Sequence, residues 1–83
     1  MYIVGLISKY EVLKTYTYSG LEEARKELKS WEKIFRTNNN VEYSTTITER
    51  DNLENVIKVK IIFKVVGGST YIMFLSKGID CRK

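Results

Sequence analysis

The sequence predicts an α+β domain in which one amphipathic helix packs on a mostly antiparallel five-stranded sheet, in the chain order β-β-α-β-β-β. Three observations favour this fold. Five segments are rich in β-branched and aromatic residues, and a segment between the second and the third has apolar residues at spacings of three and four. A Gly-Gly pair separates the last two strands. At 83 residues the chain suits a single small domain, 1–83, whose last few residues we expect to fray.

The first two predicted strands are 2–7 and 12–18, which carry most of the β-branched and aromatic residues of the N-terminal part. The polar stretch 8–11 separates them. Because short polar stretches join antiparallel neighbours, the two strands are predicted to form a β-hairpin.

The helix is predicted to begin at Ser19, whose hydroxyl can accept from the third helical N–H while Glu22 reaches back to the cap N–H. It is predicted to end at 37–40, where an asparagine can adopt the left-handed conformation of a helix C-cap. Its apolar residues share one stripe, which predicts that they, Trp31 included, pack against the sheet. The stripe consists of Leu21, Ala24, Leu28, Trp31 and Phe35, with Ile34 beside them.

The third predicted strand is 41–48, where apolar or threonine residues alternate with polar ones. A polar loop, 49–55, follows and contains Glu49, Asp51 and Glu54. Because the spacing of these acids lacks the regular oxygen ligands and central glycine of a calcium loop, we interpret them as part of a solvated loop rather than as a metal site.

The last hairpin is predicted from 56–66 and 69–76, with Gly67 and Gly68 as a two-residue loop. This loop length places Val66 opposite Ser69 and therefore predicts a register for the whole hairpin. On the core face the register pairs Phe63 with Ile72 and Ile61 with Phe74. On the opposite face it pairs Lys64 with Tyr71, Ile62 with Met73, Lys60 with Leu75 and Lys58 with Lys77.

The residue types of most hydrolase mechanisms are missing. The chain has no histidine and a single cysteine, Cys81, so no Ser-His-Asp or Cys-His arrangement can form. Gly67-Gly68 also lacks the following helix and Lys-Ser/Thr pair of a phosphate-binding loop. We expect no enzyme, no cofactor and no metal. With no apolar run of membrane-spanning length, we expect a cytoplasmic protein without membrane partners.

An apolar group on the outer sheet face is the leading candidate site. It consists of Ile62, Met73, Leu75 and Tyr71, which the predicted register turns away from the helix. Apolar residues exposed together on a small domain are typical of an interface with a partner protein or with a second copy in a homodimer. The alternatives are a slip of the register or a fold that packs both faces of the sheet internally.

The same face predicts a second candidate site, for nucleic acid, because the last third of the chain is basic. Its residues are Lys58, Lys60, Lys64, Lys77 and Tyr71, four cations beside one aromatic ring that could stack on a base. The alternative is that lysines alternating along a strand simply keep an exposed face soluble.

One local resemblance bears on function. The segment Tyr-Thr-Tyr-Ser-Gly-Leu-Glu-Glu-Ala, residues 16–24, resembles the strand-to-helix junction of the arm-binding N-terminal domain of phage tyrosine recombinases. That family reads DNA with a basic three-stranded sheet before the helix. Here only Lys9 and Lys14 are basic in a two-stranded hairpin, so no residue roles are carried over.

A short α+β chain that is rich in lysine and isoleucine and has no catalytic set also resembles small phage or mobile-element proteins that inhibit host machinery, anti-CRISPR proteins among them. Together with the missing chemistry, this resemblance favours a non-catalytic interaction module that blocks the surface of a host protein or protein–nucleic-acid complex. A nucleic-acid-binding domain is the alternative.

Overall fold

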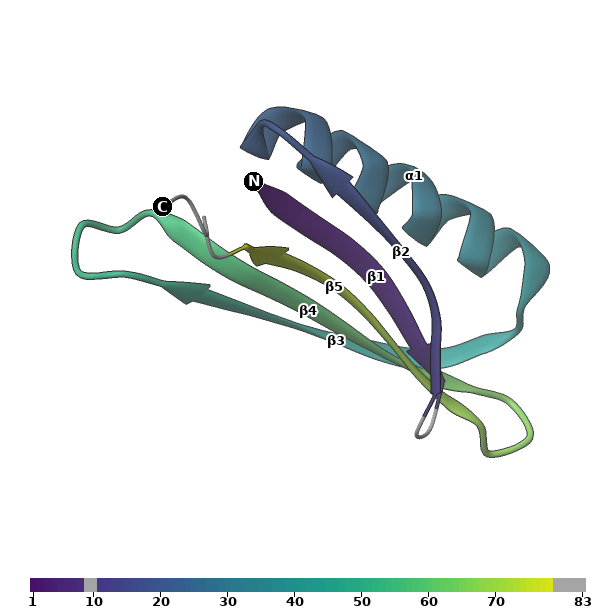
Figure 1. Cartoon of the computed structure of the whole chain (residues 1–83). Helices are drawn as coiled ribbons and strands as arrows, with labels where there is room; N and C mark the ends of the chain where they lie inside the picture. Colours follow the sequence, from purple (N-terminus) through teal and green to yellow (C-terminus); the bar gives the residue numbers. More distant parts are fainter. Residues whose placement is uncertain (9–10, 79–83) are drawn as a thin grey trace.

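A computed structural model describes residues 1–8 and 11–78, so the predicted frayed C-terminal tail, which includes Cys81, lies outside the described residues. It confirms the α+β class and the predicted order of elements. The elements, drawn in Figure 1, are β1 (Tyr2–Ser8), β2 (Glu11–Tyr18), α1 (Leu21–Asn38), β3 (Val41–Arg50), β4 (Val56–Val65) and β5 (Thr70–Lys77).

The sheet has five antiparallel strands in the spatial order β2-β1-β5-β4-β3, an order that the sequence did not determine. The first and last strands of the chain are therefore neighbours at its centre. α1 lies over one face of the sheet, and no element among those drawn lies over the other (Figure 1). We call this uncovered side the open face and the side under α1 the helix face.

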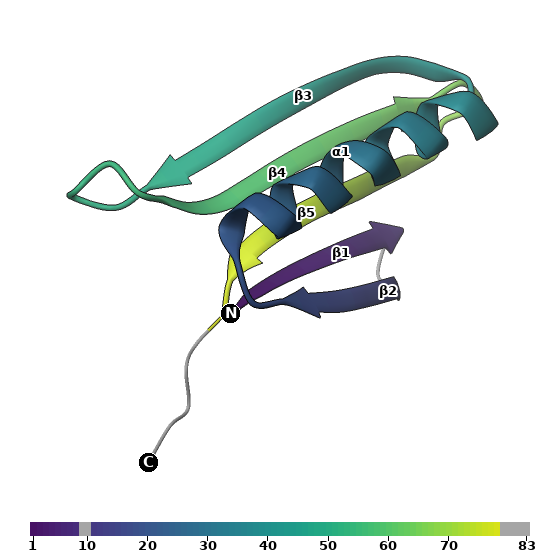
Figure 2. The ribbon, with the colours of Figure 1, turned by 90° about the horizontal axis from the view of Figure 1, so that it is seen from above.

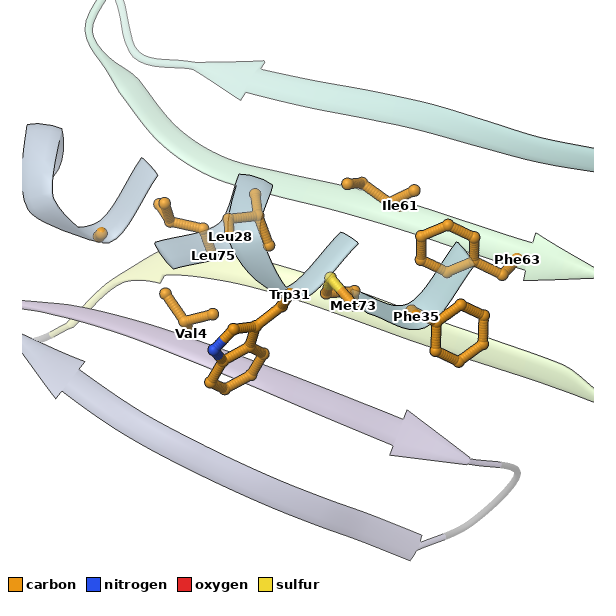
Figure 3. Close-up of a cluster of buried hydrophobic side chains, with 9 residues drawn as sticks. Val4, Leu28, Trp31, Phe35, Ile61, Phe63, Met73 and Leu75 are labelled. Carbon is orange, nitrogen blue, oxygen red and sulfur yellow. The ribbon is translucent and has the colours of Figure 1, made fainter. Parts of the chain in front are cut away.

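The core lies between α1 and the helix face (Figure 3). The apolar stripe of the helix is buried as predicted at Ala24, Leu28, Trp31 and Phe35, but Ile34 beside it is 55% exposed. The sheet contributes residues from β1, β4 and β5, and the largest fully buried side chains are Phe63, Met73, Leu75 and Val4. The domain therefore has two layers, the helix and the sheet, with a single core between them.

Both predicted caps of the helix are wrong in detail. The N-cap is Gly20 without a side-chain hydrogen bond, so Ser19 does not form the expected capping box; the Gly20 carbonyl accepts from the Ala24 N–H. At the other end Asn39 is extended, with φ −136°, rather than left-handed. Its side-chain amide still caps the helix by donating to the Phe35 carbonyl over 3.0 Å.

β3 is two residues longer than predicted and ends at Arg50. The loop after it is closed by Asp51, whose Oδ1 accepts from the backbone N–H groups of Leu53 and Asn55. These bonds hold the pKa of Asp51 below its usual range, with the Asn55 N–H the largest cause. Of the three loop acids, Asp51 therefore organises the turn, while Glu49 belongs to the strand.

The β4–β5 hairpin forms as predicted, but its register is shifted by one residue. Its loop has three residues, Val66 to Gly68, because Val65 already pairs with Ser69 and the Val66 N–H donates to the Asn40 carbonyl over 2.8 Å. Both glycines have positive φ, as the prediction required. Since a one-residue slip moves every side chain of a strand to the other face, β5 is inverted relative to the prediction.

Candidate interaction surface on the open sheet face

The open face can be assigned strand by strand from the pairing register and the core. Val4, Phe63, Met73 and Leu75 are buried under α1, so their neighbours in sequence point to the opposite side. Its apolar residues come from all five strands and are Ile3, Ile7, Val12, Ile47, Ile62, Ile72 and Phe74.

An aliphatic row crosses this face. Val12 of β2 is opposite Ile7 of β1, Ile7 is opposite Ile72 of β5, and Ile72 is opposite Ile62 of β4. The three isoleucines are half-buried by one another, and Val12 at the end of the row is 60% exposed. Four branched aliphatic side chains therefore stand side by side with no layer of the described chain over them.

Phe74 lies next to this row and covers Gly5, its cross-strand partner on β1. A Cβ added to Gly5 would come within 2.5 Å of Phe74 Cε1 and 3.1 Å of Thr15 Cγ2. The ring therefore occupies the space that any larger residue at position 5 would need. Because Gly5 has no side chain, the Phe74 ring can pack against its backbone on the open face at the centre of the sheet.

Three lysines of β4 share this face with Ile62 and lie on both sides of it along the strand. Lys58 is opposite Ser76, Lys60 is opposite Phe74 and Lys64 is opposite Thr70. A shallow hollow of about 240 Å³ joins the two kinds of residue; its walls are Ile7, Lys58, Lys60, Ile72, Phe74 and Ser76. On β3, beyond the lysines, Glu49 is opposite Lys58 and is the acidic residue of this face.

The register shift corrects the predicted interface. Ile62 lies on the open face as expected, but Met73 and Leu75 are 1% and 0% exposed on the helix face. Tyr71 is also on the helix face, half-buried, with its ring 5.2 Å from that of Phe35. Met73, Leu75 and Tyr71 therefore cannot form an outer surface with Ile62, because they pack in or against the core.

The predicted nucleic-acid set is divided in the same way. Lys58, Lys60 and Lys64 share the open face, whereas Lys77 is opposite Tyr2 on the helix side. Tyr71 is separated from these lysines by the sheet, and the aromatic residues beside them are Phe74, opposite Lys60, and Tyr43, opposite Lys64.

Sequence reasoning missed Ile7, Ile72 and Phe74, although the chain carried a signal for them. Residues 2–7 and 71–75 are nearly continuous apolar runs. Such runs are typical of strands with both faces buried, while a strand with one wet face alternates apolar with polar residues. β1 and β5 are the two strands at the centre of the sheet that carry these runs.

The helix face holds two further features. Trp31 is bracketed by β2, with Tyr16 edge-on at 5.6 Å between ring centroids and Lys14 Nζ 4.2 Å from the ring centroid. A groove of about 230 Å³ runs between α1 and β3, where Arg25, Lys29 and Glu32 face Thr46 and Thr48. Tyr16 and Lys14 are exposed, whereas Trp31 beside them is buried.

Among residues 1–8 and 11–78 there is no group of three acidic, histidine or cysteine side chains arranged to hold a metal ion. None of the described residues forms a helix that combines the length and the apolar character needed to cross a membrane. Comparisons with protein-family models, curated proteins and solved structures gave no match to this chain.

Proposed function

We propose that this chain is a non-catalytic interaction module that binds a partner protein through the open face. The observation that carries the proposal is the aliphatic row of Val12, Ile7, Ile72 and Ile62, which crosses four strands without a covering layer. An antiparallel sheet whose second face stays in water normally carries polar residues there. An apolar open face at the centre of the sheet is instead typical of a surface that a partner covers.

The lysines indicate the chemistry of that partner. Lys60 and Lys64 flank Ile62 on β4, at one end of the row, and Lys58 lies further along the same strand with Glu49 opposite it. A complementary surface would place apolar side chains over the isoleucines and carboxylates opposite the lysines. The aliphatic stems of the lysines add to the apolar contact while their ammonium groups stay at the wet margin.

A nucleic-acid ligand is the second candidate, favoured by the Phe74 ring beside Lys60 and the exposed Tyr43 ring beside Lys64. Single strands bind to sheets through aromatic rings that stack on bases and cations that contact phosphates. The row next to Phe74 is aliphatic, however, and branched aliphatic side chains offer no π-face to a base. The composition of the open face therefore supports a protein partner better than a nucleic acid.

Salt dependence separates these two candidates. With three lysines on phosphates, the logarithm of the affinity for single-stranded RNA or DNA should fall with a slope of roughly −2 against the logarithm of salt concentration. Binding to an apolar protein surface should weaken far less, because salt screens the pairs of lysines and carboxylates at its margin but not the burial of aliphatic area. Fluorescence anisotropy with a labelled mixed-sequence oligonucleotide at 50 to 500 mM salt makes the comparison.

The partner can be sought with matched baits. Immobilised wild-type chain, Ile72→Lys and Ile34→Lys are each incubated with an extract of the cells that carry the gene. Ile72 is on the open face and Ile34 is exposed on the helix, so the two variants add the same charge at different surfaces. The proposal expects a protein bound by wild type and Ile34→Lys and lost with Ile72→Lys, and the same pattern with that protein purified. A partner that binds all three baits equally would contradict it.

That the partner is a host protein, blocked by an inhibitor of phage or mobile-element origin, stays a prediction. Its test is an activity assay of the purified partner, in which wild type should inhibit and Ile72→Lys should not.

A further inference from the structure

The outer edge of β3 differs from the other edge of the sheet. β3 has ten residues, and its register shifts lie at its two ends, after Val41 and after Glu49. The opposite edge, β2, has a register shift within its length where it pairs with Leu6 and Ile7. Seen from above, β3 runs clear of α1 along most of its length (Figure 2). A long, regular and uncovered edge is a template for pairing with another strand.

The hydrogen bonds of the β4–β5 hairpin fix which peptide groups of β3 point outward. The Val65 N–H donates to Ser69 of β5, and the Val66 N–H donates to Asn40, just before β3. Since successive residues of a strand bond to opposite sides, the even-numbered residues of β4 bond to β3. Their partners on β3 are Tyr43, Thr45, Ile47 and Glu49. The peptide groups of Ser44, Thr46 and Thr48 therefore point to the open edge.

We propose that β3 pairs antiparallel with β3 of a second copy, about a twofold axis at Thr46. In this register Thr46 is opposite its own equivalent and Ser44 is opposite Thr48. These are the three residues whose backbone N–H and C=O groups point outward. Each of them is opposite another such residue of the second copy, so the two strands can exchange backbone hydrogen bonds along this stretch. Registers that place an odd residue opposite an even one cannot satisfy this condition.

The side chains are complementary in the same register. On the helix face, Ser44 lies beside Thr48; the Ser44 hydroxyl accepts from Arg36 over 2.8 Å and can still donate to the Thr48 hydroxyl, a pair of the kind that stabilises neighbouring strands. Glu42 lies opposite Arg50 at both ends of the symmetric ribbon, and no like charges stand opposite each other between positions 42 and 50. On the open face, Tyr43 lies beside Glu49 and Thr45 beside Ile47.

The pairing has a consequence for the shape of the assembly. In this register, residues of the helix face are opposite residues of the helix face in the second copy. Both copies of α1 therefore lie on one side of a continuous ten-stranded sheet, twice the five strands of one chain. The two open faces then form one surface on the other side. The proposal depends on the edge of β3 and is independent of what the open face binds.

The first test is the mass in solution, measured by size-exclusion chromatography with light scattering from micromolar to millimolar chain. Wild type should reach about twice 9.7 kDa. Thr46→Lys brings two lysines together on the axis and should raise the dissociation constant at least about tenfold. Thr17→Lys, at an exposed threonine of β2, is the control and should behave like wild type.

The second test fixes the register by disulfide formation in a Cys81→Ser background. Opposed residues of a hydrogen-bonded antiparallel pair have Cα atoms about 5.5 Å apart, within the range that a disulfide spans. Thr46→Cys should therefore oxidise to a dimer by itself. Ser44→Cys and Thr48→Cys should each stay largely uncrosslinked alone and form a mixed dimer when combined.

Three results would overturn the proposal. One is a wild-type chain that stays monomeric up to millimolar concentration. Another is a dimer that Thr46→Lys leaves intact and Ile72→Lys dissociates, which would move the contact to the open face. The third is crosslinking of Ser44→Cys or Thr48→Cys alone as readily as Thr46→Cys, which would mean another register.

Discussion

The ring of Phe74 lies over the backbone of Gly5, in the space where any other residue would have its Cβ atom. The two residues are cross-strand partners on β1 and β5, the central pair of strands. The glycine is buried although it has no side chain, because the ring covers it. This pair shows that the open face is a packed surface rather than a row of independent side chains.

Gly5 and Phe74 should therefore be energetically coupled. Gly5→Val should lower the free energy of unfolding by about 1 to 3 kcal/mol, because the ring must move away from the sheet. In a Phe74→Ala background the same change should be neutral or stabilising, since valine suits a strand better than glycine does. Urea unfolding of the four proteins in the cycle measures the coupling. Equal effects of Gly5→Val in both backgrounds would mean that the ring does not fill this space.

The register of β5 predicts opposite responses at neighbouring positions. Met73 is 1% exposed, so Met73→Ala should lower the free energy of unfolding by about 2 to 5 kcal/mol. Ile72→Lys, on the open face, should leave the isolated chain folded with a far smaller loss. Thermal and urea unfolding monitored by circular dichroism compare the two. The register that pairs Ile72 with Phe63 predicts the reverse ranking and would be supported if Ile72→Lys unfolded the chain.

Glu54 sits in a backbone conformation that suits glycine. Its φ is 66°, and among the described residues it is the non-glycine residue with a positive φ. It lies in the turn between β3 and β4. Glu54→Gly should raise the free energy of unfolding by about 1 kcal/mol, because a side chain with a Cβ is strained there. Glu54→Ala is the control for loss of charge and should give no such gain. A glycine variant no more stable than the alanine variant would contradict the prediction.

Asp51 should make the turn sensitive to acid. Its carboxylate accepts hydrogen bonds from Asn55 and Leu53, which lower its pKa in the folded chain. A group with a lowered folded pKa stabilises above its unfolded pKa, and the contribution is lost as pH falls through the folded value. Asp51→Ala should therefore be less stable than wild type at pH 7, and the difference should shrink below about pH 4. A difference that stays constant from pH 7 to pH 2 would exclude this role.

Local patterns predicted most of the fold. The helix stripe located Ala24, Leu28, Trp31 and Phe35 in the core because a period of 3.6 depends on residues within a few turns. Alternation in β4 assigned Ile61 and Phe63 to the core and the lysines to the opposite side. These predictions needed no knowledge of the other strands.

The open face was predicted only in part, because it depends on loop length and strand order. A Gly-Gly pair suits a two-residue turn and also a three-residue loop, and the contact between Val66 and Asn40 decides between them. That contact joins the loop to a residue 26 positions earlier, so no local pattern contains it. The placement of β1 beside β5, which brings Ile7 to Ile72, is equally non-local.

The most direct test of the open face is the affinity of the purified partner protein for four proteins, measured by calorimetry at 50 and 500 mM salt. These are the wild-type chain and the matched variants Ile62→Lys, Ile72→Lys and Ile34→Lys. The account predicts that Ile62→Lys and Ile72→Lys each weaken binding at least about tenfold, as substitutions at the centre of an interface do. We also predict that Ile34→Lys matches wild type and that the affinity falls with salt much less steeply than the slope of roughly −2 expected for a nucleic acid. Equal affinities for all four proteins would contradict the account, and so would a steep loss of binding with salt that is the same in each.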